Sequence, residues 1–117
     1  GMENPSKINY VFNKIRDKFP DLVCGFHVHD RIGMAATNMF SALDAGATSV
    51  EGSICGIGGG IAMPHGTGDY GNLPTEDIVT MLNRSNIETQ LDTKLVHETA
   101  EKISSLLKIN SNSRTNI

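Results

Sequence analysis

The run Gly25-Phe26-His27-Val28-His29-Asp30 holds the two residues whose types and spacing most clearly indicate chemistry. Side chains alternate between the two faces of a strand, so His27 and His29 point to the same side if this run is extended. Two neutral imidazoles on one side can bind a divalent metal ion. Paired histidines can also line a pocket and hydrogen-bond to carboxylates without a metal. The spacing alone leaves both interpretations open.

A second candidate region is the glycine-rich loop from Gly56 to Asn72, which follows a strand expected at residues 48–54. Its titratable residues His65 and Asp69 are candidates for proton transfer, the alternative being ordinary solvent-facing loop residues. A glycine run after a strand can also indicate a dinucleotide-binding turn, but that motif needs a helix at once, and here the loop continues. We therefore expect a loop that closes over a substrate.

Helical and extended patterns alternate along the chain and supply the elements that must position these residues. Apolar spacing and end signals predict helices near residues 5–19, 33–45, 74–82 and 92–107, and strands near 22–29 and 48–54. This order predicts an α/β fold with two parallel strands and right-handed crossovers. Two short strands make a poor sheet, and a complete (β/α)8 barrel takes about 250 residues. We expect an incomplete TIM barrel over residues 1–108 and a polar, disordered tail over 109–117.

Composition argues against several classes of protein. The formal net charge of −3 comes without a basic stripe, so neither nucleic acid nor an anionic membrane surface is an expected partner. No apolar run approaches the length needed to cross a bilayer. Cys24 and Cys55 fall in or at the end of expected strands, which favours reduced, packed thiols over a disulfide between neighbouring strands. Without a secretory signal at the start, the expected compartment is the cytoplasm.

Chemistry in (β/α)8 barrels lies at the C-terminal ends of the strands and in the loops that follow, so both candidate regions are expected on one face. With these regions in view, the chain resembles the 3-hydroxy-3-methylglutaryl-CoA lyase branch of a metal-dependent barrel superfamily. The resemblance runs from about Pro5 to Leu107 and covers the last two strands and their helices, the C-terminal portion of a family member. Its motifs are Gly25–Asp30, Ala45-Gly46-Ala47, Gly56-Ile57-Gly58-Gly59, Gly71-Asn72 and Thr75-Glu76-Asp77.

The resemblance implies that His27, His29 and Asn72 are three protein ligands of a catalytic divalent cation, Mg²⁺ or Mn²⁺, in the complete enzyme. The fourth ligand of the family is an aspartate on the first barrel strand, beside a catalytic arginine, and neither has a counterpart in this chain. Two imidazoles and an amide bring no negative charge to a hard cation that prefers oxygen ligands. We therefore expect this chain alone to bind such cations weakly or not at all.

The reaction implied is metal-assisted carbon–carbon cleavage of a 3-hydroxyacyl-CoA, such as 3-hydroxy-3-methylglutaryl-CoA, to acetyl-CoA and a keto acid. One departure concerns the loop, where the lyases carry a cysteine directly before a proline. Met63 precedes Pro64 here, and a thioether replaces neither an acid nor a base. The expected partners are an acyl-CoA substrate and either further copies of the chain or the rest of the barrel.

Two alternatives to the lyase interpretation stay open. The first is a Claisen-type acyltransferase of the isopropylmalate, homocitrate or citramalate synthase class. Those synthases carry a glutamate–arginine pair in a short loop before the Gly-Asn, whereas this chain has Gly59-Gly60 and a longer loop, which favours the lyase. The second alternative is a non-catalytic remnant that acts as an assembly piece, because an open part-barrel exposes sheet edges and apolar helix faces.

Overall fold

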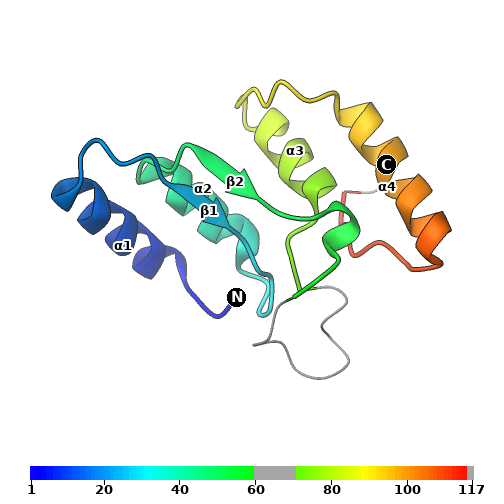
Figure 1. Cartoon of the computed structure of the whole chain (residues 1–117), viewed down its shortest axis with the longest axis horizontal. Coiled ribbons are helices and arrows are strands. Elements are labelled where there is room, and N and C mark those ends of the chain that lie inside the picture. Colours follow the sequence, from blue (N-terminus) through cyan, green and yellow to red (C-terminus); the bar gives the residue numbers. More distant parts are fainter. Residues whose placement is uncertain (60–70, 116–117) are drawn as a thin grey trace. The chain divides into compact units, whose positions relative to one another are not determined.

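The computed structural model of this chain describes residues 1–59 and 71–115. The described residues form four α-helices and two parallel strands, which confirms the predicted α/β class and the incomplete barrel (Figure 1). The elements are, in order, α1 (Pro5–Lys18), β1 (Gly25–His27), α2 (Ala35–Asp44), β2 (Ser49–Glu51), the short 3₁₀ helix η1 (Ile54–Gly56), α3 (Thr75–Arg84) and α4 (Thr93–Leu107). The chain divides into two compact units, Gly1–Glu51 and Gly52–Ile117.

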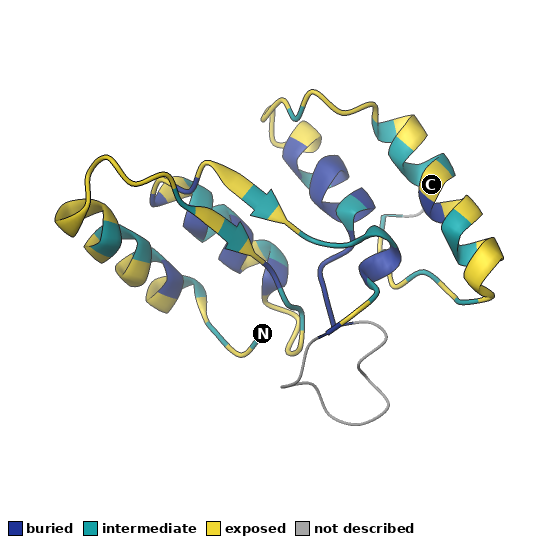
Figure 2. Cartoon of the chain, in the orientation of Figure 1, coloured by how far each residue is buried: buried dark blue, intermediate teal, exposed yellow. Residues whose placement is uncertain are grey.

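In the first unit, the two strands pair in parallel and helices cover one face of the sheet. Phe26 of β1 lies opposite Val50 of β2, and His27 lies opposite Glu51. Phe26 packs against a buried cluster made by Ile8, Ala42 and Ala47, together with Phe12, whose ring meets that of Phe26 edge-on at 5.8 Å. The alternate strand positions, which include His27, are exposed on the other face (Figure 2).

The ends of the helices in the first unit follow from local chemistry. Asn4 caps α1, since its side-chain oxygen accepts a hydrogen bond from the Lys7 N–H at 2.9 Å, and Pro5 occupies the first turn. α2 ends just before Gly46, whose φ of +101° is open to glycine but strained for other residues. The residue types at these two ends are therefore those typical of a helix start and a helix stop.

In the second unit, η1 packs against α3 and α4, and α4 runs back alongside α3 (Figure 1). The apolar core of this unit includes Cys55, Leu73, Ile78, Val79, Leu82 and Ala100. A polar contact also joins the two helices, because the hydroxyl of Thr80 lies 2.9 Å from His97 Nε2. Asp92 caps α4 through the Leu95 N–H at 3.1 Å. None of the described helices is both long enough and apolar enough to cross a membrane.

The residues after α4 contain neither helix nor strand up to Thr115, yet they make specific contacts with the start of α3. The Ser111 hydroxyl donates to Glu76, and the backbone N–H groups of Arg114 and Thr115 donate to Asp77 at 3.0 to 3.1 Å. We expected a disordered tail here because the segment is polar and lacks periodicity. Two carboxylates of α3 supply acceptors for the donors of residues 111–115.

Candidate metal centre

His27 and His29 meet on one side of the first unit. Val28 between them is 1% exposed, and its N–H donates to the Glu51 carbonyl at 3.0 Å, so this residue is anchored in the core. The histidines on either side consequently point the other way. Their Nε2 atoms lie 3.0 Å apart, and their ring centroids lie 4.9 Å apart with the rings inclined at 74°. The two imidazoles thus form one donor pair at the end of β1.

The Nε2–Nε2 distance in this pair agrees with both interpretations made from the sequence. Two ligands at about 2.1 Å from one ion, at right angles to each other, lie about 3.0 Å apart. Without a cation, one neutral imidazole can donate its N–H to the lone pair of the other at the same distance. Both arrangements need at least one Nε2 without a proton.

Burial lowers the pKa of His29 below its usual value, and the neighbouring charges of His27 and the N-terminal ammonium lower it further. The Glu3 carboxylate opposes these effects. A lowered pKa favours the neutral imidazole, which is the form that binds a metal ion. On the other side of the pair, His27 Nδ1 lies 3.7 Å from the carboxylate of Glu51. Both side chains of this contact are at least half exposed, so it orients His27 only weakly.

Asn72 lies in the second unit, and its side chain has one atom engaged and one open. The amide Nδ2 donates to the Ile57 carbonyl at 2.8 Å, while the backbone N–H donates to the Gly56 carbonyl at 3.2 Å. The Oδ1 atom is buried, and the described residues give it no hydrogen-bond partner. A buried oxygen left without a partner costs about 1–3 kcal/mol, and such atoms in native structures call for an explanation. A bound cation would supply one.

The stem of the glycine-rich loop holds Asn72 in place. The Gly71 N–H donates to the Gly58 carbonyl at 2.6 Å, so the two ends of the loop meet. Gly58 has a φ of +83°, and a Cβ there would lie 3.1 Å from Asn72 Nδ2. Only glycine fits this position without strain. His65 and Asp69, expected as proton-transfer residues, and Met63-Pro64 all lie outside the described residues.

The structure therefore brings two of the three expected ligands together, and places the third in the other unit with its oxygen open. Imidazole nitrogens and an amide oxygen are both ligand types that divalent cations accept, but none of these three donors brings a negative charge. Within residues 1–59 and 71–115, no group of three or more histidine, cysteine, aspartate or glutamate residues could hold a metal ion. The chemistry of the donor set agrees with a partial site.

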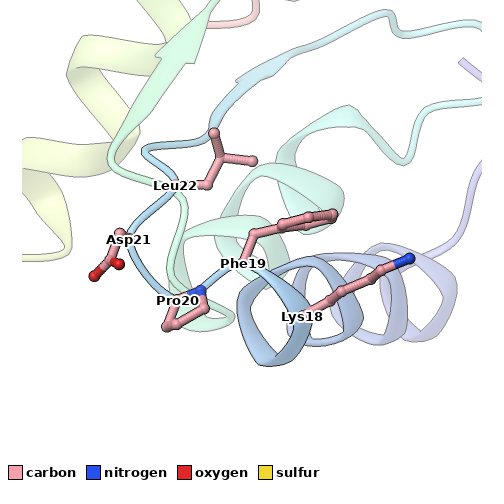
Figure 3. A pocket seen from close by; sticks show the side chains of 5 residues that line it. All are labelled: Lys18, Phe19, Pro20, Asp21 and Leu22. Carbon is pink, nitrogen blue, oxygen red and sulfur yellow. The ribbon is translucent and has the colours of Figure 1, made fainter.

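A pocket of about 580 Å³ lies elsewhere in the first unit, in the connection between α1 and β1 (Figure 3). It is lined by Lys18, Phe19, Pro20, Asp21 and Leu22. Its two charged side chains point away from one another, so they form no cluster suited to catalysis. The pocket also precedes β1, whereas barrel chemistry lies after the strands. The histidine pair is therefore the better candidate.

Comparison with known proteins decides the family. The model of the HMGL-like family matches residues 1–103, nearly the whole of the described chain. The chain belongs to the HMGL-like family. This is a family of lyase-type enzymes, and its curated relatives include both hydroxymethylglutaryl-CoA lyases and aldolases.

Among the curated relatives of this HMGL-like chain, the hydroxymethylglutaryl-CoA lyase of Bacillus subtilis (strain 168) is 38% identical over 91 residues, which cover 78% of this chain and 29% of that protein. The mitochondrial lyase of Gallus gallus is 32% identical over 114 residues, covering 97% of this chain and 37% of that protein. The 4-hydroxy-2-oxovalerate aldolase of Stutzerimonas stutzeri is 36% identical over 100 residues, covering 85% and 26%.

Solved structures of lyases match nearly all of the HMGL-like chain. The Bacillus subtilis HMG-CoA lyase superposes with a TM-score of 0.87 at 33% identity, covering 99% of this chain and 38% of that chain. An HMG-CoA lyase from Acenitobacter baumannii in complex with coenzyme A and 3-methylmalate gives a TM-score of 0.83 at 27% identity, covering 97% of this chain and 36% of that chain. This chain thus spans little more than a third of the barrels that it matches.

The acidic pair Glu76 and Asp77 is the feature of this region to which the sequence analysis gave no role. Glu76 is 0% exposed and Asp77 is 3% exposed, although both carry carboxylates. Their place in the first turn of α3 follows from helix electrostatics, since carboxylates are favoured at a helix N-terminus. In the sequence, these residues stand out only as part of the motif Thr75-Glu76-Asp77. That motif indicates the family, but it does not indicate that the two carboxylates are buried or which residues they contact.

Proposed function

We propose that this chain carries part of the active site of a metal-dependent carbon–carbon lyase that cleaves a 3-hydroxyacyl-CoA such as 3-hydroxy-3-methylglutaryl-CoA. His27, His29 and Asn72 are the proposed ligands of a divalent cation, Mg²⁺ or Mn²⁺. The observation that carries this proposal is the 3.0 Å separation of the two Nε2 atoms. It suits two neighbouring positions on one ion, in a chain of the HMGL-like family.

The residues of this chain would orient the ligand atoms of the cation but would add no negative charge to it. Val28 fixes the backbone between the imidazoles, and the loop stem directs Asn72 Oδ1 away from its Nδ2 contact. A bound divalent cation supplies Lewis-acid polarisation of the hydroxyl and carbonyl oxygens of the substrate. His65 and Asp69 are the proposed candidates to accept the hydroxyl proton as the carbon–carbon bond breaks. The products are then the enolate of acetyl-CoA, which takes up a proton, and a keto acid.

The proposed substrate class is an acyl-CoA thioester. Its support comes from the relatives named as hydroxymethylglutaryl-CoA lyases and from the solved lyase that holds coenzyme A. The proposed compartment is the cytoplasm, supported by the two free thiols, Cys24 and Cys55. Relatives of this chain include cytoplasmic and mitochondrial lyases.

Alone, the chain is proposed to be inactive and to bind the cation weakly. Its donor set is neutral, and the chain spans about a third of the lyases that it matches. Activity then requires the rest of a barrel, which would supply an anionic ligand, or an oligomer that completes the site. This requirement makes complementation the natural test.

The test combines this chain with the complementary N-terminal part of the Bacillus subtilis lyase, in the presence of Mn²⁺ and 3-hydroxy-3-methylglutaryl-CoA. We expect acetyl-CoA release from the mixture and none from either part alone. The double variant His27→Ala with His29→Ala should abolish release, while Val23→Ala, a change at an exposed residue, should not. Release that persists in the double variant would refute the ligand assignment, and tight Mg²⁺ binding in calorimetry of the single chain would refute the partial site.

A second candidate function is aldol cleavage of a 4-hydroxy-2-oxoacid, favoured by the aldolase of Stutzerimonas stutzeri at 36% identity. The same mixture separates the two functions when it is offered 4-hydroxy-2-oxovalerate without coenzyme A. Pyruvate formation from that substrate, with no cleavage of the thioester, would favour the aldolase.

A further inference from the structure

Glu76, the second residue of α3, is a buried carboxylate with partners from two other segments of the second unit. Both of its oxygens lie 3.1 Å from the Cys55 nitrogen, whose N–H donates to them, and the Ser111 hydroxyl donates to Oε1 at 2.9 Å. A carboxylate that is 0% exposed is costly unless it is hydrogen-bonded in this way. The contacts therefore tie α3 to η1 and to the tail.

The peptide at Cys55 is held from several sides. Its φ of +56° is left-handed, a conformation that a residue with a Cβ adopts only at a cost. Its N–H is held by Glu76, its carbonyl accepts from the Asn112 N–H at 3.1 Å, and its Sγ donates to the Ala100 carbonyl at 3.3 Å. These contacts stabilise a backbone conformation that the residue would not choose alone.

The turn at Cys55 leads directly to Asn72. The next two carbonyls along the chain, those of Gly56 and Ile57, accept the backbone N–H and the side-chain Nδ2–H of Asn72. The direction of these carbonyls depends on the backbone at Cys55, and the direction of the Asn72 amide depends on them. The Glu76 carboxylate is thus linked to the amide whose Oδ1 is left open by hydrogen bonds at each end and by the covalent backbone of residues 55–57 between them.

We propose that Glu76 is a positioning residue for Asn72: it holds the Cys55 turn so that the Gly56 and Ile57 carbonyls fix the Asn72 amide with Oδ1 unengaged. The significance for a cation rests on the proposed function, but the positioning itself does not. A favourable interaction between the Glu76 charge and the N-terminus of α3 does not by itself explain this arrangement. Both Glu76 oxygens accept from the backbone N–H of Cys55, which belongs to another element.

Asp77 offers a matched control beside Glu76. It is also a carboxylate in the first turn of α3, and it is 3% exposed. Its hydrogen-bond partners among the described residues are Ser113, Arg114 and Thr115, all in the tail beyond the residue that contacts Cys55. A change at Asp77 should therefore release residues 113–115 without moving the Cys55 turn, which Ser111 and Asn112 still contact.

The experiment follows the ¹⁵N-labelled chain by NMR without any metal. In Glu76→Met, which keeps the length of the side chain but removes the acceptors, we expect the Cys55 amide to lose hydrogen-exchange protection by about tenfold or more. The two Nδ2 proton signals of Asn72 should move toward the averaged values of a solvent-exposed asparagine. Glu76→Gln, which keeps one acceptor oxygen, should retain most of the exchange protection at Cys55 and most of the original chemical shifts of the Asn72 side-chain amide. In Asp77→Leu, changes should be confined to residues 113–115.

A further variant keeps the test decisive if Glu76→Met does not fold. Glu76→Asp keeps the charge at the start of α3, but the shorter side chain draws the carboxylate back from the Cys55 N–H. It should reproduce the loss of protection at Cys55 and the shift at Asn72. Unchanged Asn72 signals in Glu76→Asp, or equal changes in Asp77→Leu, would overturn the proposal. Failure of cation binding in the complemented enzyme would instead refute the proposed function and leave the positioning result standing.

Discussion

His27 and His29 of the first unit lie on an exposed sheet face, whereas Asn72 of the second unit is buried within a network of hydrogen bonds. The His27 side chain is 50% exposed, and its ring is held by strand alternation and by one buried neighbour. Asn72 is 8% exposed, and both its backbone and side-chain nitrogens are engaged. The side chains of the two units are thus placed in two different ways: by a local pattern in the first unit and by long-range contacts in the second.

This difference predicts that adding a methyl group at a closely packed glycine will lower the free energy of unfolding more in the second unit than in the first. A Cβ at Gly52 would overlap the Leu73 carbonyl oxygen and lie 2.6 Å from Ile78 Cδ1. The carbonyl cannot move freely because it accepts from the Ser53 N–H at 3.2 Å. We expect Gly52→Ala to lower the free energy of unfolding by about 3 kcal/mol, measured by urea denaturation with amide signals of the second unit as the probe.

Gly25→Ala is the matched control in the first unit. A Cβ there meets Ser49 Oγ at 2.5 Å, which is the end of a side chain that can rotate. The expected cost is below about 1 kcal/mol. If the two variants lower the free energy of unfolding by the same amount, the proposed difference in backbone packing between the two units would be wrong.

The histidine pair should depend on Val28 more than on any other single neighbour. Val28 is 1% exposed between the two histidines, so Val28→Ala leaves a cavity and is expected to cost about 2 kcal/mol. The nuclear Overhauser contacts between the His27 and His29 rings should weaken as the backbone between them loosens. Val23→Ala, at a side chain that is 78% exposed, should change neither quantity. Ring contacts that survive intact in Val28→Ala would show that the anchor is elsewhere.

Cys55 allows a test of the second unit by pH. Burial raises the pKa of its thiol, and the Glu76 carboxylate raises it further. The folded chain therefore keeps this proton at pH values where the unfolded chain, with a thiol pKa near 8.5, has lost it. Its contribution to stability is present below about pH 8.5 and is lost as the pH rises toward the folded pKa. Between pH 8 and pH 10 the free energy of unfolding of the chain should fall more than that of Cys55→Ala, as measured by urea denaturation at each pH.

Chemical labelling gives an independent check on this assignment. Cys55 is 0% exposed while Cys24 is partly exposed. Iodoacetamide should therefore modify Cys24 in the native chain at neutral pH and leave Cys55 intact until urea unfolds the second unit, as judged by mass spectrometry. Equal modification of both thiols in the native chain would contradict the burial of Cys55.

Sequence reasoning was effective where one local pattern fixes the geometry. The His27-x-His29 spacing and the apolar residue between them are enough to place two rings on one side of a strand. The cap at Asn4 is equally local, because its side-chain oxygen accepts a hydrogen bond from the N–H only three residues further on, and Pro5 beside it is typical of a first helical turn. Each of these interactions spans at most a few residues, so it can be read directly from the order of the chain.

Long-range contacts escaped the same reasoning. Glu76 accepts hydrogen bonds from Cys55 and Ser111, which are 21 and 35 positions away in the sequence. Nothing in the local sequence of α3 indicates these partners. The composition of the tail likewise does not show that Asp77 would accept its N–H groups. The roles of His65 and Asp69 stay predictions, since both lie outside the described residues.

The smallest expected effect concerns Glu51, and it sharpens the contrast between the units. Its carboxylate lies 3.7 Å from His27 Nδ1, but this contact is solvated, with the two side chains 50% and 70% exposed. Exposed ion pairs contribute little, so Glu51→Gln should change the free energy of unfolding by less than about 0.5 kcal/mol. The ring contacts between His27 and His29 should persist at low and high salt, as measured by NMR. A loss of those contacts in Glu51→Gln would mean that charge, and not the alternation of the strand around Val28, sets the histidine pair.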